Sequence, residues 1–144
     1  EKKGIDVKIL DMATQKLPFK DNFFDTVIIS DVLEHIFDPE FILKEARRVS
    51  KHKIIITTPN FSSLSQRLSV LFGKVPFQNK PQRGGHCYWF NRLVIKNMTK
   101  RNNLKIVLWG NASYMSKSLL GLPFKFLEKL FPNLFTSYLF SFYQ

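Results

Sequence analysis

The sequence predicts an α/β fold built around a parallel sheet, and three observations predict it. Residues 26–29 are a short run of β-branched apolar residues, the pattern of a strand buried on both faces. Residues 53–58 are a second run of this kind. Between them, Asp38-Pro39-Glu40 can begin a helix, with a capping carboxylate, a proline suited to the first turn and an acid at the positive end of the dipole. Strand, helix and strand in this order form the βαβ unit of a parallel sheet.

The other elements follow from periodicity and capping signals. The helix that begins at Pro39 should run to about Val49, with Ile42 and Ala46 on its apolar side. Asn91 can cap a second helix over residues 91–103. The apolar set of that helix is Leu93, Val94, Ile95 and Met98. We also expect strands at residues 7–10, 104–109 and about 138–142, an amphipathic helix at 62–72, a basic loop at 73–85, and a covering or lipid-facing helix at 122–131.

The composition indicates one globular domain with an uneven charge. The chain has 144 residues, 44% of them hydrophobic, and a formal net charge of +11. All of this excess lies after residue 60, because residues 61–144 contain twelve Lys and Arg but a single acid, Glu128. The asymmetry favours an anionic partner: a phosphate-bearing substrate, an anionic membrane surface or a nucleic acid. A solvated basic surface without a partner would give the same count.

Cysteine usage and hydropathy favour a cytoplasmic protein. Cys87 is the one cysteine, which excludes an internal disulfide and fits a reducing compartment. The chain opens with Glu-Lys-Lys and has neither a secretory leader nor an initiating Met, so we expect it to be part of a longer protein. Residues 119–143 are rich in Leu and Phe, but their two prolines and three charges argue against a membrane-spanning helix. Peripheral association with an anionic membrane is the alternative for this segment.

Five short motifs carry a resemblance to a known family. They are Asp11-Met12-Ala13, Leu17-Pro18-Phe19, Phe24-Asp25-Thr26-Val27, Asp31-Val32-Leu33-Glu34-His35 and Ile56-Thr57-Thr58-Pro59-Asn60. In this order and spacing they resemble the class I S-adenosylmethionine-dependent methyltransferases, above all the UbiE/UbiG-like (type 11) branch. The resemblance implies a Rossmann-like methyltransferase sheet with strand order 3-2-1-4-5-7-6. Here its first two strands and the glycine-rich loop that cradles the cofactor are lacking, so the expected domain is N-terminally truncated.

On that template the chain divides into three parts. Residues 1–60 form the cofactor-side βαβ part, residues 61–103 a variable segment that covers the acceptor, and residues 104–144 the C-terminal strands and a hydrophobic helix. The predicted strands would then be strands 3, 4, 5, 6 and 7 of the family sheet. Strands 3 and 4 flank the lacking pair, which leaves unpaired backbone groups and exposed apolar faces. We therefore expect the fragment alone to be poorly stable, to bind the cofactor weakly and to be inactive.

The resemblance also implies cofactor contacts at two strand ends. Asp11 would accept a hydrogen bond from the adenine amino group, and the Met12 N–H would meet a ring nitrogen, with Ala13 completing the tripeptide. Ser30 and Asp31 would lie beside the methionine portion and the sulfonium, where a carboxylate is electrostatically favourable. The alternative for Asp11 is a turn in which nearby amides satisfy its carboxylate.

The loop after residue 30 raises a sharper question. If it forms a helical turn, Asp31, Glu34 and His35 stand at i, i+3 and i+4 and share one face. These groups could hold a divalent cation such as Mg²⁺ or Zn²⁺, as a similar trio is implicated in doing in some ubiquinone-pathway O-methyltransferases. Alternatively, His35 is a general base, or Glu34 and His35 only join the loop to its neighbours. His86 is a second candidate base, or a loop residue stacked on Tyr88 or Trp89.

The expected function is S-adenosylmethionine-dependent methyl transfer to a small-molecule or lipid-linked acceptor, at oxygen in preference to nitrogen or carbon. An RNA methyltransferase that uses the basic second half is the enzyme alternative. Against it, the aromatic residues form no recognisable base-stacking module. The non-enzyme alternative is a truncated domain that serves only as an interaction partner.

Overall fold

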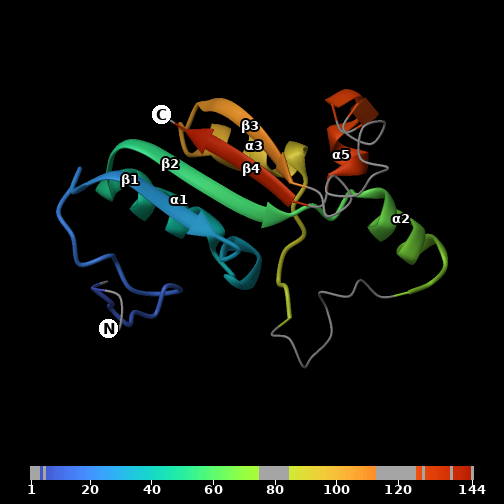
Figure 1. Ribbon diagram of the computed structural model, residues 1–144. Helices are drawn as coiled ribbons and strands as arrows, with labels where there is room; N and C mark the ends of the chain where they lie inside the picture. The colour runs from blue at the N-terminus through green and yellow to red at the C-terminus, as the bar shows by residue number, and fades with distance from the viewer. Residues whose placement is uncertain are drawn as a thin grey trace.

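A four-stranded mixed sheet is the centre of the molecule (Figure 1). The computed structural model describes residue 4 and residues 6–74, 85–112, 126–127, 129–136 and 138–143. The strands are β1 (Phe24–Ser30), β2 (Ser50–Pro59), β3 (Ile106–Ala112) and β4 (Tyr138–Tyr143), and their spatial order is β1-β2-β4-β3. β1 and β2 are parallel, whereas β4 runs antiparallel to both of its neighbours. This confirms the α/β class, and the order matches the 4-5-7-6 half of the predicted sheet.

The βαβ unit forms as its sequence signals predict. α1 (Pro39–Val49) connects β1 to β2, and the Asp38 carboxylate accepts a hydrogen bond of 3.0 Å from the Phe41 N–H at its start. Ile42, Ala46 and Val49 are all buried, which confirms the predicted apolar side of the helix. Local capping and the 3.6-residue period therefore suffice to define this element.

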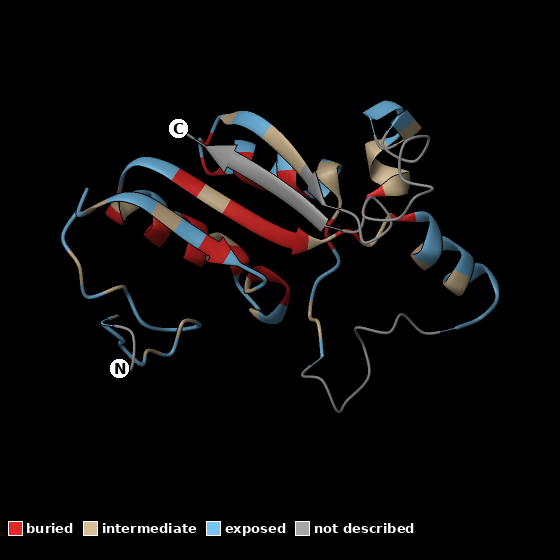
Figure 2. Cartoon of the chain, viewed as in Figure 1, coloured by how far each residue is buried: buried red, intermediate tan, exposed pale blue. Residues whose placement is uncertain are grey.

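The core lies between one face of the sheet and the two helices α1 and α3 (Arg92–Arg101), as the buried positions in Figure 2 show for α1 and β2. Ile54 and Ile56 point into it from β2 and are 3% and 0% exposed. Ile28 of β1 faces the other way and is 65% exposed, because side chains alternate between the two faces of a sheet. The buried cluster consists of Ile29, Leu33, Ile42, Leu43, Ala46, Ile54, Ile56, Phe90, Ile95, Met98 and Leu104.

α3 begins as predicted but buries less than predicted. Asn91 caps it by accepting a hydrogen bond of 2.9 Å from the Val94 N–H. Ile95 and Met98 enter the core, whereas Leu93 and Val94 stay exposed. The prediction of one apolar set was therefore wrong for two of its four members. The buried side of this helix is narrow, with Thr99 as its third buried residue.

The predicted strand at residues 7–10 is wrong. Residues 6–10 are irregular in the structure, and the side chains of Val7 and Ile9 are exposed. A strand needs a neighbour to satisfy its backbone groups, and among the described residues no strand lies beside this segment. The apolar residues of this segment therefore predicted a strand for which the described residues supply no neighbouring strand.

The later elements agree with the sequence where they are described. The predicted helix at 62–72 is α2 (Leu64–Leu71), and the predicted strand at 104–109 is β3, which starts at Ile106. The predicted final strand is β4, preceded by the short α5 (Pro132–Phe135). The basic loop at 73–85 lies largely outside the described residues. Of the helix predicted at 122–131, the described residues 126–127 and 129–130 are helical. Among the described residues, no helix combines the length and the apolar character needed to cross a bilayer.

Two polar anchors hold the irregular segments to the sheet and to α1. Arg48 of α1 donates hydrogen bonds of 2.9 and 2.7 Å to the carbonyls of Leu17 and Phe19, and it pairs with Glu45 at 2.7 Å. The Glu45 carboxylate also accepts from the Leu17 N–H at 2.9 Å. At the other end of the sheet, the buried Asn60 amide donates to the Thr136 carbonyl at 2.8 Å and so joins the end of β2 to α5.

Candidate functional site

Polar groups gather at the carboxyl ends of the parallel strands β1 and β2. The hydroxyls of Ser30 and Thr57 are 3.0 Å apart across the two strands. The Asp31 N–H donates to the Thr57 carbonyl at 3.1 Å, and the Thr57 hydroxyl lies 3.4 Å from the Asp31 carboxylate. Ligands of open α/β sheets bind at this end of the strands. The structure thus brings the predicted Ser30 and Asp31 to the expected edge.

Asp31 has an unusual backbone. Its φ of 50° lies in the left-handed region, which a non-glycine residue rarely adopts and which costs conformational energy. This conformation occurs directly after the end of β1, and the chain continues into the 3₁₀ turn η1 (Leu33–His35). Leu33 anchors this turn in the core with no exposed surface.

A helical turn is present, but it spans only Leu33–His35 and leaves out Asp31, whose φ is positive. It also places Glu34 and His35 in different environments. Glu34 is 1% exposed, while His35 is exposed to solvent. Burial raises the pKa of the Glu34 carboxyl above its ordinary value, and the nearby negative charge of Asp31 adds to the effect. One Glu34 carboxylate oxygen, Oε2, has no hydrogen-bond partner among the described residues.

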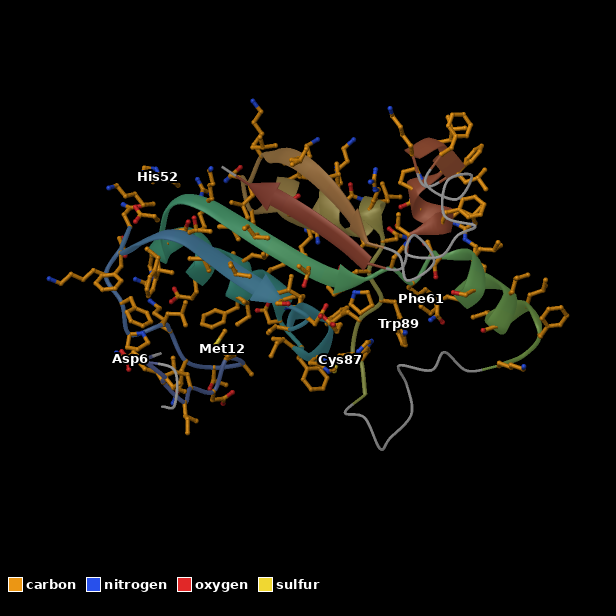
Figure 3. The ribbon with its side chains drawn as sticks, in the orientation of Figure 1. Asp6, Met12, His52, Phe61, Cys87 and Trp89 are labelled. Carbon is orange, nitrogen blue, oxygen red and sulfur yellow. The ribbon has the colours of Figure 1, made fainter. Side chains whose placement is uncertain are left out.

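A distant segment docks on η1 and brings a second imidazole. The N–H groups of Cys87 and Tyr88 both donate to the Glu34 carbonyl, at 2.7 and 3.3 Å. As a result the rings of His35 and His86 meet edge to face with centroids 4.7 Å apart. Figure 3 shows Cys87 beside η1 and Trp89 beside Phe61, near the end of the sheet.

Glu34, His35 and His86 form the one group of three close ligand atoms found among the described residues. One ligand atom of each lies within 4.8 Å of the others, and Asp31 is not part of this group. Burial lowers the pKa of His86, and a positive charge on His35 would lower it further, whereas Asp31 acts in the opposite direction. The metal set that included Asp31 stays a prediction, and the geometry offers His86 in its place.

A very small cavity adjoins this cluster. Its volume is about 10 Å³, which suits one water-sized particle. Glu34 and His86 supply its polar lining. The rest of the wall is apolar or aromatic and consists of Pro59, Phe61, Tyr88, Trp89 and Phe90.

The predicted adenine-binding tripeptide forms a tight turn. The Asp11 carboxylate accepts hydrogen bonds from the Thr14 hydroxyl at 2.7 Å and from the Ala13 N–H at 3.0 Å. These bonds lower the pKa of Asp11, with the Thr14 hydroxyl as the larger cause. Asp11 therefore has the geometry of a turn-forming residue whose carboxylate is satisfied by nearby groups, and a role in binding adenine stays a prediction.

Met12 lines an open hollow of about 780 Å³ together with Phe19, Phe23 and Phe24. Neither Asp11 nor Asp31 lines it. The hollow has the volume of a cofactor site, but the two carboxylates that the resemblance assigned to one cofactor do not meet there.

Sequence reasoning missed two parts of this site. Thr57 belongs to the motif at residues 56–60, but that motif did not indicate that its hydroxyl would contact Ser30 or that its carbonyl would accept a hydrogen bond from Asp31. The approach of His86 to Glu34 and His35 had no local signal, since it depends on backbone contacts between segments far apart in the chain.

Solved structures share the fold. An S-adenosylmethionine-dependent methyltransferase from Thermotoga maritima, described as a possible histamine N-methyltransferase, aligns with a TM-score of 0.62 and 15% identity. The alignment covers 89% of this chain and 59% of that one. Magnesium protoporphyrin IX methyltransferase from Synechocystis, solved with bound S-adenosylhomocysteine, aligns with a TM-score of 0.57 and 18% identity over 93% of this chain and 48% of that one. The sheet is thus that of the Rossmann-like methyltransferases.

Sequence comparisons identify the family. An uncharacterised protein from Methanocaldococcus jannaschii is 45% identical over 58 residues, which are 39% of this chain and 27% of that protein. The chain thus spans between 27% and 59% of the length of these three proteins. The UbiE/UbiG branch stays a prediction, because the family model that matches is another one. Residues 1–112 match the model of the methionine biosynthesis protein MetW, and the chain belongs to the MetW family.

Proposed function

We propose that the protein to which this chain belongs transfers a methyl group from S-adenosylmethionine to an oxygen of a small-molecule or lipid-linked acceptor. The observation that carries the proposal is the polar edge formed by Ser30, Asp31 and Thr57 in a methyltransferase-type sheet. A bound cofactor supplies an electrophilic methyl group, and an edge of this kind suits its cationic end.

The residues fit such a cofactor chemically. The Asp31 carboxylate is exposed and, among the described residues, receives a long contact of 3.4 Å from Thr57, so it keeps the capacity to accept hydrogen bonds and to face a cation. Asp11 is engaged in its turn, but each carboxylate oxygen retains a second lone pair for an adenine amino group. The N–H of Met12 is the proposed donor to the adenine ring, and Ala13 holds the turn.

His35 and His86 are the proposed general bases, which take the proton from the molecule that receives the methyl group. In the transfer, the acceptor oxygen forms a bond to the methyl carbon as the carbon–sulfur bond breaks. The hydroxyl proton passes to an imidazole, and S-adenosylhomocysteine leaves. Alignment of the two reactants supplies most of the acceleration in such an in-line displacement. Removal of the proton by an imidazole is a smaller, additional contribution.

An exposed apolar surface at one end of the sheet supports a lipid-linked acceptor. α2 exposes Leu68, Val70 and Leu71, and Phe72 follows it with 72% of its surface exposed. Phe126, Leu130 and Phe131 are exposed as well, in the segment before α5, and Figure 1 shows α2 and α5 near the same end of the sheet. The basic excess after residue 60 is the complement of an anionic headgroup.

Transfer of tritiated methyl from S-adenosylmethionine to lipid extracts and to small phenols tests the reaction in the whole protein. We expect Asp31→Asn to lower the rate by about tenfold or more, equivalent to roughly 1.4 kcal/mol of transition-state stabilisation. Asp25→Asn is the matched control, since Asp25 is an exposed carboxylate at the opposite end of β1. A protein that binds the cofactor but transfers no methyl group to any acceptor would refute the proposal.

Co-sedimentation with vesicles of phosphatidylglycerol and phosphatidylcholine tests the membrane part. Leu71→Ser with Phe72→Ser should reduce binding at low salt. Leu93→Ser is the control and should leave vesicle binding unchanged, because Leu93 is equally an exposed leucine but lies on α3 and not on the apolar surface formed by α2 and the segment before α5. If the unmodified protein fails to bind at low salt, the acceptor is not reached through a membrane surface.

A further inference from the structure

The cluster of Glu34, His35 and His86 has a feature that methyl transfer does not require. Glu34 is a carboxylic acid with 1% exposure, and its Oε2 has no hydrogen-bond partner among the described residues. Leaving a buried polar atom unpaired is unfavourable, and more so when the group is charged. A residue of this kind at the edge of a site indicates that something else binds to it.

The small cavity that Glu34 lines limits what that partner can be. The cavity that Glu34 and His86 line has a volume of about 10 Å³, and its other walls are aromatic rings and a proline. An organic acceptor does not fit such a volume, whereas a water molecule or a single ion does. Glu34 and His86 line the cavity, and His35 lies outside the lining but brings a ligand atom within 4.8 Å of theirs, so a cation at the edge of the cavity could use all three groups.

The donor atoms define the kind of ion. Glu34 offers a carboxylate oxygen, and His35 and His86 each offer an imidazole nitrogen, all within 4.8 Å of one another. Two imidazoles and one carboxylate are the protein ligands of one class of zinc site, in which the fourth position stays open. Imidazole donors also favour Zn²⁺ and its neighbours over Mg²⁺ or Ca²⁺, which prefer oxygen.

We propose that Glu34, His35 and His86 form a binding site for a divalent transition-metal cation, with Zn²⁺ as the reference ion. Its position joins two segments, because η1 supplies two ligands and the segment that docks on it supplies the third. The hydrogen bond of 2.7 Å from the Cys87 N–H to the Glu34 carbonyl already holds these segments together.

Binding requires only a small closure. Zinc bonds of about 2.1 Å place tetrahedral ligand atoms roughly 3.4 Å apart. The present separations of up to 4.8 Å can shorten by side-chain rotation of His35, which is exposed, and of His86, which is half-buried. The edge-to-face contact of the two rings would then give way to coordination of one cation by both.

The site does not depend on the proposed function, although the two share residues. A nitrogen lone pair bound to a cation cannot accept a proton, so in one molecule His35 and His86 act either as ligands or as bases. Cation binding and methyl transfer can therefore be measured separately. Failure of one leaves the other standing.

Calorimetric titration of the metal-free protein with Zn²⁺ tests the proposal. We expect one ion per chain with micromolar or tighter affinity, and a weakening of about tenfold or more for His86→Ala and for His35→Ala, as loss of one ligand implies. His52→Ala is the matched control, since His52 is the third histidine and lies on β2 outside the cluster. Cys87→Ser tests whether the adjacent thiol contributes, and we expect no change.

Cobalt substitution supplies a second measurement that does not involve activity. Co²⁺ in a tetrahedral site of two nitrogens and one oxygen gives visible absorption bands, and Glu34→Gln should abolish or shift them while His52→Ala leaves them in place. Circular dichroism of each variant separates loss of a ligand from loss of the fold. Absence of binding by the folded protein, or binding that His86→Ala leaves unchanged, would overturn the proposal.

Discussion

Leu33 is the residue whose replacement best tests how the core positions the site. It has no exposed surface, and it directly precedes Glu34 and His35 in η1. Leu33→Ala removes the transfer free energy of a buried side chain and leaves a cavity, which together cost about 2–5 kcal/mol. The turn is held at its other side by two hydrogen bonds to the Glu34 carbonyl, so it cannot easily collapse into the cavity. We therefore expect a loss of about 3 kcal/mol in the free energy of unfolding.

Urea unfolding, followed by circular dichroism and by the fluorescence of Trp89 and Trp109, measures this loss. Leu93→Ala is the matched control, because it makes the same change at a side chain that is 62% exposed and should cost less than about 0.5 kcal/mol. Leu33→Met keeps the volume and should cost less than about 1.5 kcal/mol. Equal losses for the two leucine-to-alanine variants would refute the assignment of Leu33 to the core and, with it, the account of how η1 is anchored.

Three further predictions concern stability. Hydrogen bonding to Arg48 lowers the pKa of Glu45, so this carboxylate stabilises the fold above its ordinary pKa of 4.5 and loses that contribution as the pH falls through the folded-state pKa. The difference in urea midpoint between the wild type and Glu45→Gln should therefore shrink from pH 7 to pH 3, and a difference that stays constant would contradict this prediction. Asn60→Ala should cost about 1–3 kcal/mol in urea unfolding because it removes the side-chain donor to the carbonyl of the buried Thr136, while Asn97→Ala, at an exposed side chain, should cost almost nothing. Asp38→Ala should lower the free energy of unfolding by about 1 kcal/mol through loss of the α1 cap. Asp38→Asn should keep most of the stabilisation that the cap provides, and identical thermal melts for the two variants would argue against the cap.

The elements that the sequence predicted well are those defined by local chemistry. α1 needed only Asp38, Pro39 and an apolar period, and β1 and β2 needed only runs of β-branched residues. The strand predicted at residues 7–10 failed because a strand is defined by its neighbour, and its sequence carries no information about whether that neighbour is present. The apolar set of α3 failed at Leu93 and Val94, where hydrophobic identity alone did not indicate which side faces the core.

The candidate site shows the same division. Ser30 is the last residue of β1 and Asp31 follows it, so their place at the edge of the sheet could be predicted from the fold class. The burial of Glu34 beside an exposed His35 could not, because the 3₁₀ turn sends adjacent side chains to different environments. His86 reaches the cluster only through backbone contacts made by Cys87 and its neighbour, which no local pattern encodes.

The insertion of β4 between β2 and β3 has a consequence for how the chain is made. Among the described strands, β3 pairs with β4 alone, and β4 follows it in the sequence. During synthesis the β1-α1-β2 unit can assemble while the rest is still being translated, but β3 must wait without a strand partner until β4 has left the ribosome. The half of the sheet that carries Asp31 and η1 therefore has time to form before the other half closes.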